Sequence, residues 1–121
     1  SATSVTVAPL PSPLGTTVAN SSVSVALDGS SILIANKGDE PVYFAAYPLE
    51  MLDLIFWTPC SEPASCRDAL VKPGQIRRVS LRSVARPATQ TVVVFIWSIQ
   101  TRPDGTGTYA TEPSRVNLAL P

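Results

Sequence analysis

Short apolar stretches alternate with turn-forming residues along most of the chain. From Val23, apolar residues alternate with small or polar ones over residues 23–27, and Asp28 and Gly29 supply a turn before the apolar stretch 32–35. This pattern predicts a β-hairpin. After a second turn at residues 36–41, residues 42–47 are apolar on both faces and rich in aromatic side chains, which predicts a central strand of a sheet.

The middle and the second half of the chain continue in short segments. Residues 48–53 predict at most a turn or two of helix, and residues 54–57 predict a return to strand. A strand is expected over residues 75–82, with a β-bulge near Arg77 and Arg78, because the apolar positions change phase there. Residues 91–100, which are apolar at every position from 92 to 97, predict a core strand covered on both sides.

A last strand is expected where Val116, Leu118 and Leu120 alternate with smaller or polar residues. About seven short strands, with a turn roughly every ten residues, predict an all-β domain built as a two-sheet antiparallel sandwich. A closed barrel is the competing architecture. The length of 121 residues predicts one folded domain, which we place at residues 21–121, and the 12 prolines argue against an all-helical chain.

Residues 1–20 carry no charged residue, and Pro9, Pro11 and Pro13 alternate with other residues. This composition predicts an extended leader or tether of polyproline character, with one edge strand at residues 5–7. A simple chain boundary or an ordered edge strand are the alternatives. Because the only methionine is Met51, we expect a processed or engineered chain.

The charge balance restricts the classes of partner that the chain is expected to bind. Nine basic residues match nine acidic ones, so no overall field attracts phosphate backbones, and we expect no nucleic-acid partner. No apolar run reaches the length of a membrane span, so membrane contact is expected only through a tether that this sequence does not contain.

The two cysteines, Cys60 and Cys66, flank a short loop with prolines around them. Two thiols without histidine cannot complete an ordinary zinc site, which favours a disulfide. A disulfide that closes so small a loop stabilises the folded state by about 2.4 kcal/mol, because it lowers the conformational entropy of the unfolded chain. Disulfides persist in oxidising compartments, so a secreted, periplasmic or cell-surface location is expected. The alternative is two unpaired thiols in a cytosolic protein.

The order of these features resembles immunoglobulin-like domains of exported bacterial proteins. The resemblance rests on the hairpin of residues 23–36, the aromatic strand after it, and Leu70-Val71-Lys72-Pro73-Gly74 before another strand. It extends over about residues 23–120 and implies a fold but no activity. The cysteine pair departs from antibody domains, since Cys60 and Cys66 can close only a local loop.

Candidate catalytic chemistry is sparse. The chain has no histidine, so the histidine-dependent nucleophile arrangements cannot be assembled. A carboxylate pair can serve a glycosidase, but nothing in the sequence places any two of the candidates in one cleft; these are Glu50, Asp53, Glu62 and Asp68. Calcium at Asp104 has too few nearby oxygen ligands to be favoured. We therefore expect no enzyme, no cofactor and no metal site.

Four of the nine basic residues lie within ten positions: Arg77, Arg78, Arg82 and Arg86. One interpretation is contact with an acidic partner, phosphate headgroups or an anionic polysaccharide. The other, which we favour, is an edge strand that its charges keep from pairing. Arg77, Arg78 and Arg82 are retained as candidate binding residues.

The aromatic residues allow two interpretations as well. A carbohydrate-binding module exposes two or three rings in a row, whereas a structural role places them in the core. We expect Phe95 and Trp97 to be interior or at a sheet boundary. Trp57 lies either on the disulfide or at the surface as a candidate binding residue. The function expected is a non-catalytic extracytoplasmic binding or structural module with a protein or polysaccharide partner; a carbohydrate-binding module, or more remotely a small carboxylate-dependent hydrolase, is the alternative.

Overall fold

Strands and short 3-10 turns make up the computed structural model, which describes residues 16–17 and 22–121. No helix within this described part is long and apolar enough to cross a membrane. The turns are η1 (Leu49–Met51), η2 (Pro63–Ser65), η3 (Arg67–Ala69) and η4 (Leu81–Ser83). The strands are β1 (Thr16–Thr17), β2 (Val23–Asp28), β3 (Ser31–Asn36), β4 (Val42–Pro48), β5 (Leu70–Val71), β6 (Ile76–Ser80), β7 (Thr91–Trp97), β8 (Ile99–Thr101), β9 (Thr108–Ala110) and β10 (Ser114–Ala119).

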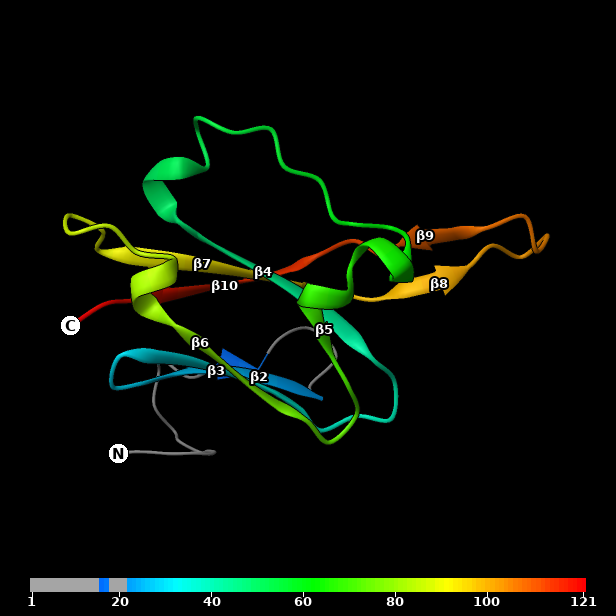
Figure 1. Ribbon diagram of the computed structural model, residues 1–121, viewed down its shortest axis with the longest axis horizontal. Helices are drawn as coiled ribbons and strands as arrows, with labels where there is room; N and C mark the ends of the chain where they lie inside the picture. The colour runs from blue at the N-terminus through cyan, green and yellow to red at the C-terminus, as the bar shows by residue number, and fades with distance from the viewer. Residues whose placement is uncertain (1–15, 18–21) are drawn as a thin grey trace.

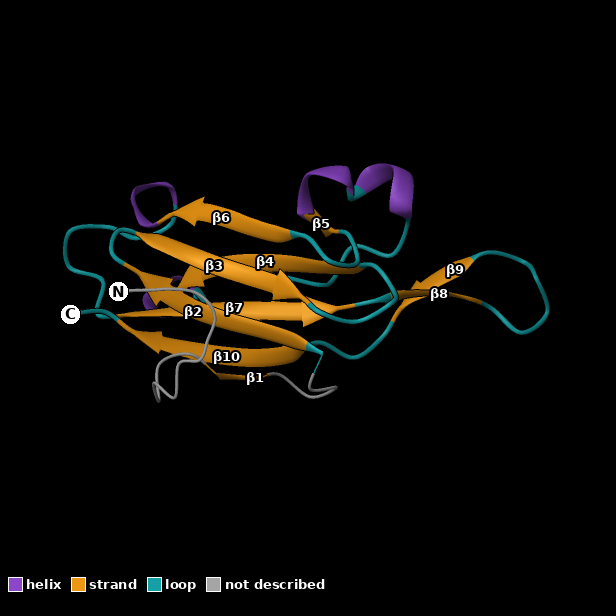
Figure 2. Cartoon of the chain, turned by 90° about the horizontal axis from the view of Figure 1, so that it is seen from below, coloured by secondary structure: helices purple, strands orange, loops and turns teal. Residues whose placement is uncertain are grey.

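All strand pairs are antiparallel and form three sheets. The first sheet has the order β1-β2-β3-β6, and the second has the order β10-β7-β4-β5. Among the described residues, strands β8 and β9 pair with each other alone and extend beyond the two larger sheets as a hairpin arm (Figure 2). The all-β, antiparallel prediction is confirmed.

The first and second sheets share one apolar core. Alternate residues of their strands point into it, as the period of two along a strand requires. Val23, Val25, Ile32 and Ile34 come from the first sheet, and the second contributes Val42, Val71, Val92, Val94, Ile96, Val116 and Leu118. The two sheets therefore pack face to face, and the strand alternation seen in the sequence marks the residues between them.

The opposite face of the second sheet is also covered along β4 and β7, whereas β10 leaves this face exposed. Tyr43 and Trp97 point away from the shared core and belong to a second cluster that includes Phe95 and Cys66. Residues 49–69, which we call the covering segment, lie over this face (Figure 1). The prediction that the strand within residues 91–100 is covered on both sides is confirmed for β7. The predicted central position of residues 42–47 is confirmed as well, since β4 lies between β7 and β5.

The strand predicted at residues 54–57 is wrong. These residues belong to a turn and an irregular stretch of the covering segment, and they pair with no strand. The physical reason is topological: β4 already has β5 and β7 as neighbours, so the chain that leaves β4 cannot pair with it and crosses the face of the sheet instead.

Strand β6 is regular, so the predicted bulge is wrong. Its pairing with β3 is one to one from Ile76 opposite Ala35 to Ser80 opposite Ser31. The apolar positions change phase because Ile76 faces outward, with 60% of its surface exposed, while Arg77 points inward. No extra residue is inserted in the strand. Leu81 then reaches the core from η4.

The strand predicted over residues 91–100 is interrupted at Ser98. The Ser98 backbone N–H donates to Thr111 Oγ1 at 3.0 Å instead of to a strand partner, and β8 begins at the next residue in a different sheet. The count of about seven strands was therefore low, because short strands such as β5, β8 and β9 leave little pattern in the sequence.

Of residues 1–20, only Thr16–Thr17 is described, and it pairs with β2 as the outermost strand of the first sheet. The predicted strand at residues 5–7, and with it most of the predicted leader, lies outside the described residues.

A buried asparagine joins the two sheets at one end of the shared core. Asn36 is 1% exposed, and its Nδ2 donates to the carbonyl oxygens of Glu40 at 2.7 Å and Val71 at 3.0 Å. Its Oδ1 accepts from the Gly38 N–H at 3.0 Å. Asn36 therefore fixes the turn after β3 and links the first sheet to β5 of the second.

We predict that Asn36→Ala lowers the free energy of unfolding by about 2 to 3 kcal/mol, because three partly buried backbone groups lose their partner. Urea denaturation measures the change. Asn117→Ala, on the exposed side of β10, is the matched control and should stay within about 0.5 kcal/mol of the parent protein. Equal losses in the two variants would contradict the role given to Asn36.

Candidate functional site

The covering segment is the feature that sets this domain apart from a plain pair of sheets. It leaves β4 through η1, runs as an irregular stretch, passes through η2 and η3, and returns as β5. Figure 1 shows it on the side of the second sheet that faces away from the first sheet. It therefore forms a third layer, and its outward side chains define a surface of their own.

Aromatic stacking attaches the covering segment to the sheet. The Trp57 ring stacks on Phe95, with ring centroids 4.4 Å apart and an interplanar angle of 20°. It also meets Trp97 edge to face at 5.5 Å and Tyr47 at 6.1 Å. Such pairs contribute about 0.5 to 1.5 kcal/mol each beyond the area they bury. Trp57, the candidate binding residue, therefore anchors the covering segment.

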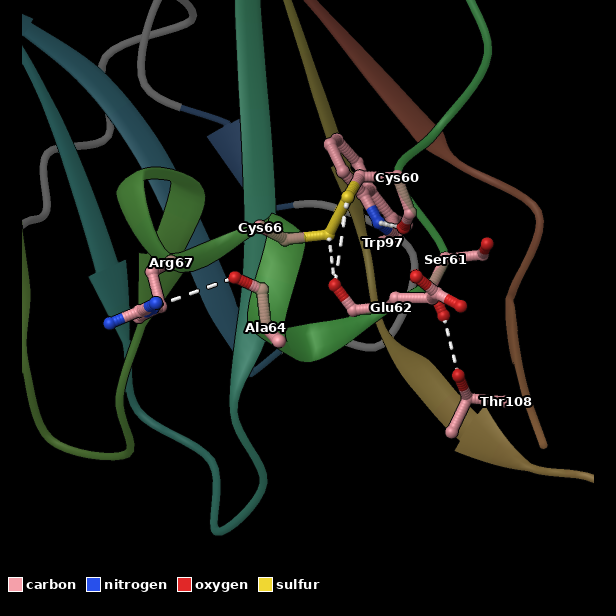
Figure 3. Close-up of a disulfide and its surroundings, with 8 residues drawn as sticks. All are labelled: Cys60, Ser61, Glu62, Ala64, Cys66, Arg67, Trp97 and Thr108. Carbon is pink, nitrogen blue, oxygen red and sulfur yellow. Dashed lines mark hydrogen bonds between the residues drawn. A yellow bond between two sulfur atoms is a disulfide. The ribbon is translucent and has the colours of Figure 1, made fainter.

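A disulfide closes the far end of the same cluster. Cys60 and Cys66 are bonded, with their Cα atoms 6.0 Å apart, which confirms the predicted pairing. The Trp97 indole Nε1 donates to the Cys60 carbonyl oxygen at 2.9 Å, and Thr108 Oγ1 donates to the Ser61 carbonyl oxygen at 2.7 Å (Figure 3). The loop is thus tied both to β7 and to the β8–β9 hairpin.

Residues 52–59, which we call the Phe56 loop, run from the end of η1 to the disulfide and include Trp57. Leu54 and Phe56 are 77% and 96% exposed, whereas Ile55 and Trp57 between and after them are half-buried. This alternation is typical of extended backbone. Within the described part of the chain, the backbone groups of residues 55–59 make no hydrogen bond. The loop therefore exposes two apolar side chains, and its backbone is not paired with another described segment.

The clustered arginines do not form one surface stripe. Arg77 and Arg78 point to opposite faces of β6, as neighbours on a strand must. Arg77 reaches across to the second sheet, where it donates to the carbonyl oxygens of Leu70 at 2.7 Å and Asp68 at 3.1 Å, and its guanidinium lies 5.2 Å from the centre of the Phe44 ring. It therefore closes the gap between β6 and β5.

The other arginines lie on the surface. Arg78 forms an exposed ion pair with Asp28 at 3.3 Å, of a kind that contributes little to stability. Arg82 lies in η4, and Arg86 follows in the loop before β7; both are exposed. Strand β6 is an edge of the first sheet in the described residues, in keeping with the expectation that charge protects an edge. Binding by these arginines stays a prediction.

The four candidate carboxylates are all exposed, and none of them is described in contact with another. Glu50 accepts a hydrogen bond from Thr89 Oγ1 at 2.7 Å. This bond is the main cause that lowers the pKa of Glu50, with a smaller contribution from the charge of Arg86. Glu50 therefore links η1 to the loop before β7.

Metal-ligating residues do not gather in the described part of the chain: no group of three or more cysteine, aspartate or glutamate side chains is placed to hold an ion. Asp104 uses its Oδ1 to accept from the backbone N–H of Thr106 at 3.0 Å and from its hydroxyl at 2.7 Å. These bonds shape the tip of the β8–β9 hairpin and lower the pKa of Asp104.

The rings that a sugar would stack on are largely occupied. Trp57 and Phe95 cover one another, and the Tyr43 ring lies over Trp97 with centroids 6.3 Å apart. The exposed rings are those of Phe56 and Tyr109, which come from different segments, and Arg102 lies 5.9 Å from the Tyr109 ring. No row of open rings marks a sugar platform among the described residues.

Comparison with known proteins adds no relative: the chain matches no protein-family model, no curated protein and no solved structure.

Sequence reasoning did not single out Phe56. It treated the residue as one member of a strand at residues 54–57 and placed the candidate binding role on its neighbour Trp57. The signal was present in the alternation itself, because consecutive side chains of an extended segment point in opposite directions. If Trp57 packs inward on the disulfide, Phe56 must point outward.

We predict that Thr89→Val raises the pKa of Glu50 toward the ordinary value of about 4.3, because the valine cannot donate the hydrogen bond. An NMR titration of the side-chain carboxyl groups measures it, with the Thr106-bonded Asp104 as an internal control that keeps its lowered pKa. Since the folded-state pKa of Glu50 is depressed, its stabilising effect is present above the unfolded-state pKa and is lost as the pH falls through the folded-state value. An unchanged Glu50 titration would contradict the assignment.

Proposed function

We propose that this domain is a non-catalytic, extracytoplasmic binding module that recognises a protein partner through the Phe56 loop. The observation that carries the proposal is the exposure of Phe56, 96%, directly beside Trp57, which is packed against Phe95 and Trp97. An apolar ring held in water on an anchored loop costs free energy unless a partner covers it.

The finer fold assignment is part of this proposal: an immunoglobulin-like sandwich. The strand order supports it, since the main strands divide as β2-β3-β6 in one sheet and β10-β7-β4-β5 in the other. The connections β3 to β4, β5 to β6 and β6 to β7 therefore cross between sheets, as they do in immunoglobulin-type sandwiches. This class of fold commonly carries binding sites on the segments that join its strands.

The disulfide supports the proposed location. Cys60 and Cys66 are bonded, and such bonds are rare in reducing compartments. The bond closes the segment that follows Phe56, so an oxidising environment also keeps the binding loop in its folded position.

The surface features favour binding over catalysis. Glu50 is engaged by Thr89, and Arg77 is engaged by the carbonyls of Leu70 and Asp68. These polar groups hold segments of the fold in place. Within the Phe56 loop, the exposed side chains of Leu54 and Phe56 are apolar, and the backbone groups of residues 55–59 have no partner in the described structure.

We predict that a photo-crosslinking phenylalanine analogue at position 56 captures one discrete protein partner when the full protein is produced in its own organism. The reason is that the reactive ring then lies at the centre of the contact. Mass spectrometry identifies the adduct, and addition of unlabelled parent protein should compete it away while Phe56→Ala should not. The same analogue in place of the exposed Asn117, which is not a candidate binding residue, is the control. Equal capture at both positions, or none at 56, would overturn the proposal.

A further inference from the structure

The exposed ring of Phe56 is of a shape that a concave pocket on a partner can enclose. A single ring projects from the loop, with half-buried residues on either side of it. A flat surface would cover only one side of such a ring and would leave much of it in water. A pocket that encloses the ring buries it fully, and full burial of a phenylalanine contributes about 1.5 to 3 kcal/mol.

The backbone beside Phe56 is not paired within the described structure. Residues 55–59 form no internal backbone hydrogen bond in the described structure, and their side chains alternate as in a strand. A partner can therefore pair with the main chain as it would with an added strand while one side chain enters its pocket. Main-chain pairing on an extended segment, combined with one deep side-chain pocket, is how endopeptidases bind the chains they act on.

We propose that the Phe56 loop is the inhibitory loop for an endopeptidase whose main specificity pocket accepts an aromatic side chain. The inference rests on the proposed function, because it names the class of partner for the same loop. In this arrangement Phe56 fills the pocket, and the Phe56–Trp57 peptide bond lies across the catalytic group of the enzyme.

The anchors on both sides of this bond explain why the loop inhibits and is not simply consumed. Before it, Glu50 accepts a hydrogen bond from Thr89 Oγ1 at 2.7 Å, which ties η1 to the loop before β7. After it, Trp57 stacks on Phe95, and Trp97 holds the Cys60 carbonyl. Hydrolysis would add water across the amide, leaving a carboxylate on Phe56 and a free amine on Trp57. The stacked Trp57 keeps that amine beside the new carboxylate, so the product chain cannot leave.

The same anchors reduce the entropic cost of binding. A free peptide must be ordered when it enters the enzyme, whereas this loop is already held by the disulfide and the aromatic cluster. Complexes between proteases and preorganised inhibitors are among the tightest known for their interface size.

The test uses the full, oxidised protein with chymotrypsin, whose specificity pocket accepts aromatic side chains, and with trypsin, whose pocket carries a carboxylate. Residual activity on a small chromogenic substrate is measured against protein concentration, and the chain is followed by mass spectrometry. We expect inhibition of chymotrypsin, weak or no inhibition of trypsin, and an intact chain after many turnovers of the chromogenic substrate.

The variants make the test specific to one residue. Phe56→Ala should weaken inhibition of chymotrypsin by roughly 100-fold, as expected for the central residue of an interface. Leu54→Ala, a matched change at an exposed apolar residue of the same loop, should weaken it by less than about tenfold. The Phe56→Arg variant should no longer inhibit chymotrypsin and should inhibit trypsin instead, because the arginine can pair with the carboxylate in the specificity pocket of trypsin. Removal of the disulfide by Cys60→Ala with Cys66→Ala should turn the inhibitor into a cleaved substrate.

Two results would overturn the inference: no inhibition of chymotrypsin by the oxidised protein, or hydrolysis of the Phe56–Trp57 bond as fast as that of an unstructured peptide. Equal weakening by Phe56→Ala and Leu54→Ala would overturn the assignment of the pocket residue. These failures are distinguishable from failure of the proposed function. If the crosslink from position 56 to a partner still forms, the proposed binding function is kept and only the protease inference is rejected. If the crosslink does not form, both the binding function and the protease inference are rejected.

Discussion

The burial of both faces of strands β4 and β7 in the second sheet is the constraint on which the rest of this structure depends. Strand β7 presents Val92, Val94 and Ile96 to the shared core, and Phe95 and Trp97 to the other side. An uncovered face of this kind would expose a large apolar patch, so each face needs its own cover. The first sheet supplies one cover. The covering segment supplies the other, and its disulfide and aromatic contacts follow from that requirement.

The proposed binding function depends on the same covering segment. A segment of only 21 residues cannot bury every apolar side chain it carries, because consecutive residues of an extended stretch point in opposite directions. Because the Trp57 ring packs on Phe95, the side chain of the preceding residue, Phe56, faces the solvent. The Cys60–Cys66 bond and the Trp97 bond to the Cys60 carbonyl then hold the loop, so the exposed ring keeps a defined position.

Sequence reasoning predicted what depends on local pattern and missed what depends on pairing. The β2–β3 hairpin, the doubly buried β4 and β7, and the local disulfide follow from residue spacing alone. The segment 54–57 has the alternation of a strand, and its side chains alternate in exposure, but β4, the strand that precedes it, is already paired on both sides. The phase change in β6 was resolved by turning Arg77 inward against Phe44, a tertiary contact between distant segments that no local pattern contains. The role of Phe56 was missed for the same reason, since its direction follows from what its neighbour packs against.

The central claim is that the covering segment is docked on the second sheet through its aromatic ring pair. A double-mutant cycle between Trp57→Leu and Phe95→Leu, measured by denaturant unfolding of the oxidised protein, tests it most directly, because the cycle isolates the contact between the two rings. The structure predicts a coupling free energy of about 0.5 to 1.5 kcal/mol, the range found for packed aromatic pairs. Strictly additive losses, with no coupling between the two positions, would contradict the account.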